Sequence, residues 1–158
     1  MGVRYKEKEG RKIMPKTNLG KMSRGKQALK TARWARTMTK WLITYSNKRG
    51  VKWQFVEFGG ATGAESYGIV DILAVRKDHK TKTEKIKRGD YLDIVLIQTK
   101  GGSARLPTDE DKRRLHEVAK HHRAKTVVLA EWKKKEKLNF YKLKKNDWIP
   151  VKPKEIFG

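Results

Sequence analysis

Cysteine is absent from this chain of 158 residues. Its absence excludes a disulfide framework, a thiolate-bound zinc ion and a cysteine nucleophile. Acidic residues are also scarce, because 17 Asp and Glu stand against 40 Lys and Arg and leave a formal charge of +23 at pH 7. A chain this positive repels itself unless a polyanion screens its charge, so we expect nucleic acid to be the partner.

Long apolar runs are missing too. The longest have four residues, such as Ile94–Ile97 and Val127–Ala130, whereas roughly 20 apolar residues are needed to cross a bilayer. The basic amino-terminal stretch has no apolar segment behind it, unlike a secretory signal. We therefore expect an intracellular protein, cytoplasmic or nucleoid-associated, that is neither secreted nor bound to a membrane.

The sequence divides into a basic arm and one domain. Residues 1–22 are rich in Lys and Arg, poor in apolar residues and without periodicity. They are predicted to be either an arm that a polyanion or a partner chain orders, or a solvated tail. Residues 23–158 carry the apolar patterning of a folded domain, and we expect the core there.

The first predicted element is a basic helix over residues 25–48, capped by Ser23 and ended by Gly50. Apolar side chains recur at helical spacing and are expected to pack on the core: Ala28, Ala32, Ala35, Leu42 and Tyr45. Cations repeat the same spacing on the opposite face: Lys26, Lys30, Arg33 and Lys40. Because the helix contains no acidic residue, this second face is interpreted as a positive ridge that follows a phosphate backbone.

The remaining pattern predicts an α/β domain. Strands are expected at 53–58, 68–77 and 91–100, with a long hairpin tip over 78–90. A helix is expected from Thr108 to about Arg123, because Thr108 and Asp111 have capping-box spacing. Two more strands are expected at 126–132 and 138–143. Three tryptophans, Trp34, Trp41 and Trp53, are expected to pack in the protein, although an exposed one could stack on an unpaired base.

Candidate chemistry lies at the ends of two expected strands. Asp71 is near the start of 68–77, and Gln98, Thr99 and Lys100 end 91–100. Alternation places Gln98 and Lys100 on one face, and antiparallel pairing could bring Asp71 to the same point. A carboxylate, an amide oxygen, the Thr99 backbone carbonyl and water suit Mg²⁺. A lysine beside that cation could orient or help deprotonate an attacking water.

These residues carry a family resemblance. The segment GIVDILAV at 68–75, a hairpin, and VLIQTK at 95–100 resemble the PD-(D/E)xK nuclease superfamily, in the Mrr-type variant with glutamine at the motif glutamate. The loop over 59–66 is similar to that of archaeal-type Holliday-junction resolvases. The resemblance spans roughly residues 25–143 in element order. It implies a restriction-endonuclease-like αβββαβ core, with a central mixed sheet flanked by helices.

The resemblance also implies an activity. Asp71 and Gln98 would bind Mg²⁺, for which Mn²⁺ could substitute, and Lys100 would be the catalytic lysine of a DNA endonuclease. The DNA would be duplex or branched, and the protein a homodimer. Glutamine lacks the charge of the usual glutamate, so metal binding is expected to be weak.

The first helix lacks the carboxylate that many members of the superfamily carry there. Glu57, at the end of the first strand, and Glu65, in the loop, are the candidates to replace it as metal ligands. Gln27 is the nearest polar substitute on the helix itself.

Phosphate contacts are expected from a set of cations, which would position DNA without reading its sequence: Lys26, Lys30, Arg33, Lys40, Arg105, Lys112 and Arg113. Two kinds of enzyme agree with these residues, a junction resolvase and a homing or restriction enzyme. In the second kind, the hairpin tip at 78–90 could hold the side chains that contact bases. The alternatives are a non-catalytic basic DNA- or RNA-binding protein and an inactive relative that acts as an architectural DNA binder.

Overall fold

The structure is a computed structural model that describes residues 23–48, 50–58, 68–133 and 136–158. The basic arm expected over residues 1–22 lies outside the described residues. The elements along the chain are α1 (Arg24–Ser46), β1 (Gln54–Glu57), β2 (Ile72–Lys77), β3 (Leu92–Gly101), α2 (Asp109–His121), β4 (Thr126–Trp132), β5 (Asn139–Lys144), β6 (Asp147–Val151) and α3 (Pro153–Phe157).

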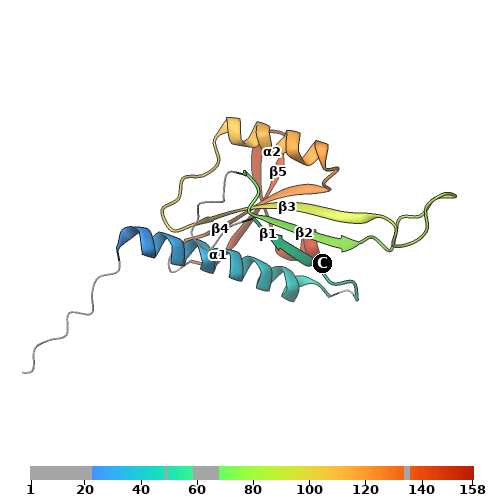
Figure 1. Ribbon diagram of the computed structural model, residues 1–158, viewed down its shortest axis with the longest axis horizontal. Helices are drawn as coiled ribbons and strands as arrows, with labels where there is room; N and C mark the ends of the chain where they lie inside the picture. Colours follow the sequence, from blue (N-terminus) through green and yellow to red (C-terminus); the bar gives the residue numbers. More distant parts are fainter. Residues whose placement is uncertain (1–22, 49, 59–67, 134–135) are drawn as a thin grey trace, which may run out of the picture.

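The strands form one six-stranded mixed sheet in the order β1-β2-β3-β4-β5-β6. Pairing is antiparallel throughout except between β3 and β4, which are parallel. A parallel pair needs a crossover connection, and α2 provides it. Figure 1 shows α1 and α2 on opposite faces of the sheet. The predicted α/β fold with a central mixed sheet flanked by helices is confirmed.

Alternation along β3 divides the core between the two faces. Ile97 packs with Ile43 of α1 and Phe157 of α3 on one face, whereas Leu96 packs with Leu115 of α2 on the other. We call these the α1 face and the α2 face of the sheet. The expectation that the middle of this strand is buried on both faces is confirmed, as its continuous apolar run indicated.

Helix α1 begins and ends within two residues of the predicted limits, and its buried face overlaps the predicted one at Ala35 and Leu42. Its buried side chains are Ala35, Thr39 and Ile43, whereas Ala28 and Tyr45, expected to pack, are exposed. Burial of Thr39 is possible because its hydroxyl donates to the Ala35 carbonyl, 2.7 Å away, within the helix. The apolar spacing therefore predicted part of the buried stripe and missed Thr39 and Ile43.

The tryptophans behave differently from one another. Trp53 is buried as expected, but Trp34 and Trp41 are 51% and 56% exposed, so the prediction that they pack in the protein is wrong. They follow Arg33 and Lys40 on a helix whose contact with the sheet is made by smaller residues. Neither tryptophan is needed to fill the core.

The last two elements, β6 and α3, were not predicted. Pro150 within β6 is a poor signal for a strand, because proline cannot donate to a ladder and is tolerated at an edge. β6 is such an edge strand, paired only with β5 among the described strands. Among the described residues, no helix is long and apolar enough to span a bilayer.

The predicted hairpin tip at 78–90 is present between β2 and β3. Asp78 accepts hydrogen bonds from the backbone N–H groups of Lys80 and Thr81, at 2.7 and 3.3 Å, and from the Thr81 hydroxyl. The Thr81 hydroxyl, followed by the Lys80 N–H, lowers the pKa of Asp78 from 3.8 to about 2. The ionised carboxylate therefore stabilises the start of the tip.

This depressed pKa predicts a specific acid sensitivity. The stabilisation is complete above the ordinary pKa of 3.8 and is lost as the pH falls through about 2. Between these values we expect the free energy of unfolding of the wild type to fall more steeply than that of Asp78→Asn. Urea denaturation at a series of pH values measures both slopes. If the free energy of unfolding falls equally steeply with pH in the two proteins, this carboxylate does not stabilise the fold.

Candidate functional site

Asp71 lies at an irregularity just before β2. Ile72 is paired with Ile97 of β3, and the N–H of Asp71 also donates to the Ile97 carbonyl, at 3.0 Å. Two successive residues therefore face one, which is the arrangement of a β-bulge. A bulge re-aims side chains relative to regular alternation, and it sends Asp71 to the α1 face.

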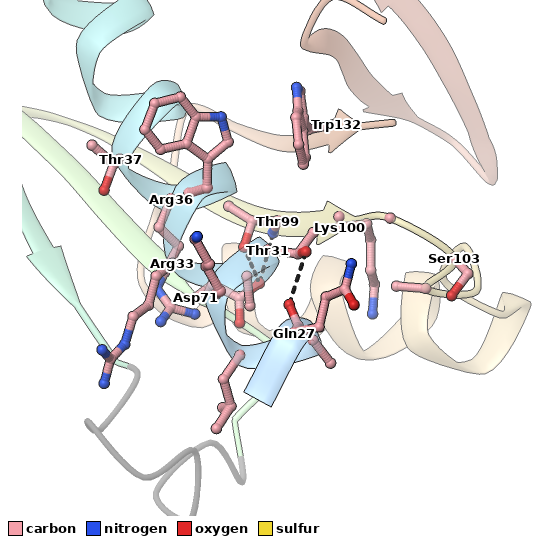
Figure 2. Close-up of a pocket in the computed structure, with 18 of the residues that line it drawn as sticks. Gln27, Thr31, Arg33, Arg36, Thr37, Asp71, Thr99, Lys100, Ser103 and Trp132 are labelled. Carbon is pink, nitrogen blue, oxygen red and sulfur yellow. Dashed lines mark hydrogen bonds between the residues drawn. The ribbon is translucent and has the colours of Figure 1, made fainter. Parts of the chain in front are cut away.

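The Asp71 carboxylate is fixed against β3 by Thr99. Oδ2 of Asp71 accepts from the Thr99 N–H at 2.6 Å and from the Thr99 hydroxyl at 3.1 Å, as Figure 2 shows. Both residues are half-buried. Thr99, expected to offer its backbone carbonyl to a metal, thus holds the carboxylate through its two donors.

Gln98 lies on the other side of the sheet. Alternation from Ile97 places its side chain on the α2 face, where it is 7% exposed. Its Oε1 is buried and has no hydrogen-bond partner among the described residues. A regular register would have put Gln98 opposite Asp71 on one face, so the bulge separates them. The expected convergence of Asp71, Gln98 and Lys100 is therefore not found.

Asp71, Thr99 and Lys100 line an open pocket of about 1600 Å³ between α1 and the carboxyl ends of β3 and β4. Gln27 of α1 and Trp132 of β4 also line it, and Figure 2 shows these residues around Asp71. The helix contributes a row of cations, which we call the α1 cations: Arg24, Lys26, Lys30, Arg33 and Arg36. Asp71 is the sole carboxylate among the described residues that line the pocket.

The glycines that end β3 allow the helix to approach closely. A Cβ at Gly101 would lie 3.1 Å from Thr31 Cγ2 and 3.4 Å from the Thr31 carbonyl oxygen of α1. Gly102 has a φ of +64°, in the left-handed region that favours glycine. These two glycines therefore allow α1 to lie close over the end of the sheet.

Lys40 and Glu57 are engaged with each other. Glu57 of β1 forms ion pairs with Lys40 and, at 3.8 Å, with Arg36 Nε. Lys40 was predicted on a solvent-facing ridge, but it is half-buried and its ammonium group is paired with Glu57. Glu57 is thus occupied by helix cations. Glu65, the other carboxylate considered, lies outside the described residues.

The remaining predicted phosphate contacts lie near the start of α2. Lys112 is paired with Asp109 at 2.9 Å, whereas Arg105 and Arg113 are exposed. Hydrogen bonds from Thr108, the predicted cap, lower the pKa of Asp111.

Lys100 contributes to the same shift. Its charge, together with that of Arg114, is a smaller cause of the lowered pKa of Asp111. Alternation places the Lys100 side chain on the α2 face, as it does for Gln98, so Lys100 lies at the end of β3 between the pocket that it lines and the amino terminus of α2.

The pocket offers few of the oxygen donors that Mg²⁺ prefers. No group of three or more His, Cys, Asp or Glu side chains that could hold a metal occurs within the described residues. Mg²⁺ is commonly bound by one or two carboxylates together with substrate phosphates and water. Asp71, with the Gln27 amide nearby, fits a cation shared with a bound phosphate. It does not fit an all-protein cage.

Comparisons with known proteins give no match to this chain, whether against family models, curated proteins or solved structures. The site is therefore interpreted from its own geometry.

Some residues of the pocket were missed as functional candidates, namely Arg24, Arg36 and Trp132. A signal existed for Trp132, because it ends the strand parallel to β3, and parallel strands finish at the same edge of a sheet.

Proposed function

We propose that this protein is a metal-dependent endonuclease that hydrolyses phosphodiester bonds in DNA at the pocket beneath α1. One observation carries the proposal: Asp71, with Thr99 and Lys100 of β3 beside it, lines a pocket whose other wall is the row of α1 cations. A carboxylate, a lysine and a phosphate-binding wall are the groups that this reaction requires.

Each group has a distinct task in the proposed reaction. The α1 cations bind backbone phosphates and bring one of them to Asp71. Asp71, held by Thr99, presents a carboxylate of fixed orientation. The metal ion, when bound, supplies Lewis acidity and lowers the pKa of a water. Lys100, at the rim of the pocket, supplies positive charge to the scissile phosphate once its flexible side chain turns from α2 into the pocket.

The topology is consistent with this proposal. The antiparallel β1, β2 and β3, the crossover α2 and the parallel β4 have the αβββαβ order that the PD-(D/E)xK resemblance implies. Gln98 departs from the pattern of that superfamily, because it occupies the position that would bind metal and its side chain faces α2. Cutting both strands of a duplex suits two sites, so we also propose a homodimer.

Cleavage assays test the proposal directly. The protein is incubated with supercoiled plasmid and with a synthetic four-way junction, in Mg²⁺, Mn²⁺ or EDTA. Cutting with Mg²⁺ or Mn²⁺ but not with EDTA is expected. Comparison of the junction with linear duplex then separates structure-selective from sequence-selective cleavage. Binding without cutting in every condition would contradict the nuclease.

Salt dependence tests the phosphate-binding wall. Each neutralised phosphate releases counterions, so the logarithm of the binding constant should fall linearly with the logarithm of salt concentration. We expect Lys30→Ala to reduce that slope by about 1. Lys144→Ala is the matched control. This exposed lysine ends β5, at the opposite end of the strands from Trp132 and the pocket. Equal slopes for the two variants would contradict the assignment.

A second candidate is a non-catalytic nucleic-acid-binding protein. The observation in its favour is that Asp71 already has a structural task, since its carboxylate accepts both donors of Thr99. This candidate predicts the same salt dependence with no cleavage in any metal, so the assays above distinguish it from the nuclease.

A further inference from the structure

Helix α1 carries large aromatic side chains on its outer surface. Trp34, Trp41 and Tyr45 are 51%, 56% and 64% exposed. At 100° per residue, their spacings of seven and four place them within roughly 40° of one another around the helix. We call these three residues the aromatic stripe. Exposed aromatic groups of this size indicate an interaction surface.

The aromatic stripe begins at the pocket. Trp34 lines it together with Asp71 and Lys100. With a rise of 1.5 Å per residue, Tyr45 lies roughly 16 Å farther along the helix. A strand that leaves the pocket along α1 would therefore pass over all three rings.

The rings at the far end are already arranged as a stack. Trp41 and Tyr45 have centroids 5.3 Å apart and planes within 6° of parallel. Lys48 Nζ lies 5.1 Å from the centroid of the Tyr45 ring. This cluster combines exposed aromatic surface with a cation, as do the sites by which proteins bind single-stranded nucleic acid.

The charge around the stripe selects the occupant. Lys30 lies about 40° from Trp34 around the helix, Lys48 follows the end of the helix beside Tyr45, and α1 contains no acidic residue. A second copy of this chain would bring an equally basic α1 against the stripe, which like-charge repulsion opposes, so the proposed homodimer would form through another surface. A polyanion is attracted, and only unpaired bases can stack on exposed rings, because a duplex buries the faces of its bases.

We propose that the aromatic stripe binds unpaired bases of a single-stranded segment that continues into the pocket. This inference rests on the proposed function, because it takes the phosphate in the pocket to belong to the same strand. The substrate is then DNA with an unpaired stretch beside the cleaved phosphate, as at a branch, flap or gap, rather than continuous duplex.

Binding without cleavage tests the inference. Fluorescence anisotropy in EDTA compares a labelled single strand with a hairpin duplex of equal length. Trp34→Ala and Trp41→Ala should each weaken single-strand binding roughly 5- to 150-fold, and duplex binding should change less than about twofold. Trp34→Phe, which keeps a ring, should recover most of the loss. Tyr91→Ala removes an exposed aromatic residue next to the hairpin tip and should have no effect.

The outcomes are separable. If the wild-type protein binds neither the single strand nor the duplex, the proposed function itself is wrong. Normal binding that the stripe variants leave unchanged, or weaken equally for single strand and duplex, would overturn the stripe alone. If sedimentation shows a dimer that Trp41→Ala dissociates, with nucleic-acid binding unchanged, the stripe is a self-association surface and the inference is wrong.

Discussion

Asp71→Asn should abolish metal-dependent DNA cleavage and leave both folding and DNA binding in place. The amide keeps an oxygen that can accept from the Thr99 N–H, so the local structure is retained. It removes the negative charge that a metal ion requires. We expect cleavage to fall on the order of a hundredfold or more, measured as initial rates on the preferred substrate at saturating protein.

Lys100 and Gln98 provide the matched variants. Lys100→Ala should lower cleavage to a similar extent, because the charge near the reacting phosphate is lost. Gln98→Met keeps the size of a side chain that faces α2 and removes an amide oxygen that has no partner among the described residues. We expect it to cut at nearly the wild-type rate with unchanged or slightly higher stability.

These three variants distinguish the observed arrangement from the one that the family resemblance implies. If Gln98→Met is as inactive as Asp71→Asn, Gln98 reaches the metal and the bulge does not separate the two residues during catalysis. If Asp71→Asn cuts like the wild type, the reaction does not take place at this pocket.

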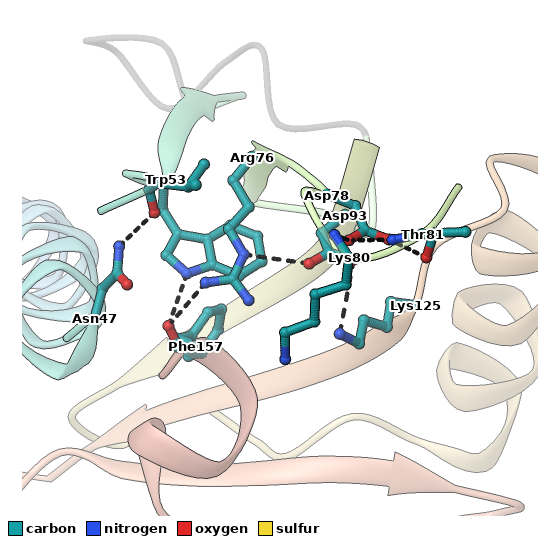
Figure 3. Close-up of polar contacts among 10 residues, drawn as sticks. Asn47, Trp53, Arg76, Asp78, Lys80, Thr81, Asp93, Lys125 and Phe157 are labelled. Atoms are coloured by element: carbon teal, nitrogen blue, oxygen red, sulfur yellow. Dashed lines mark hydrogen bonds and ion pairs between the residues drawn. The ribbon is translucent and has the colours of Figure 1, made fainter. Parts of the chain in front are cut away.

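Phe157→Ala should have the largest effect on stability. Phe157 is completely buried, and its ring contacts Trp53 edge to face, with centroids 5.3 Å apart, and Phe140 at 6.3 Å. Figure 3 shows the Trp53 Nε1 and an Arg76 guanidinium N–H donating to the Phe157 carbonyl, at 3.0 and 3.4 Å. Removing the ring leaves a cavity in the α1 face, which costs about 3–5 kcal/mol.

Urea denaturation followed by tryptophan fluorescence measures this loss. Ile149→Ala is the matched control, since Ile149 of β6 is 44% exposed and its truncation should cost less than about 1 kcal/mol. Alanine keeps the main-chain carbonyl at 157, so the difference reports packing of the ring. Equal effects of the two variants would show that α3 does not belong to the core.

Most of the fold could be predicted because its signals are local. The continuous apolar run of β3 and the capping box of Thr108 and Asp111 depend only on neighbours along the chain, and both are confirmed. β6 and α3 could not be predicted in this way. Pro150 obscures the strand pattern, and α3 is a five-residue helix whose packing of Phe157 comes from Trp53, far away in the sequence.

The candidate site was only partly predictable for a related reason. Asp71 and Lys100 were correctly placed near one edge of the sheet, since strand ends follow from the pattern. The face to which Asp71 points depends on the bulge opposite Ile97, and no residue pattern marks it. The buried face of α1 likewise turns on Thr39, whose polarity hides its packing role.

The close approach at Gly101 determines the width of the pocket. The smallest side chain there would press against Thr31, and relief of that contact would lift the amino half of α1 from the sheet. Lys26 and Lys30, carried on that half, would then stand farther from Asp71. The absence of a side chain at Gly101 thus sets the distance between the α1 cations and the Asp71 carboxylate. That distance limits the thickness of the strand that can enter the pocket.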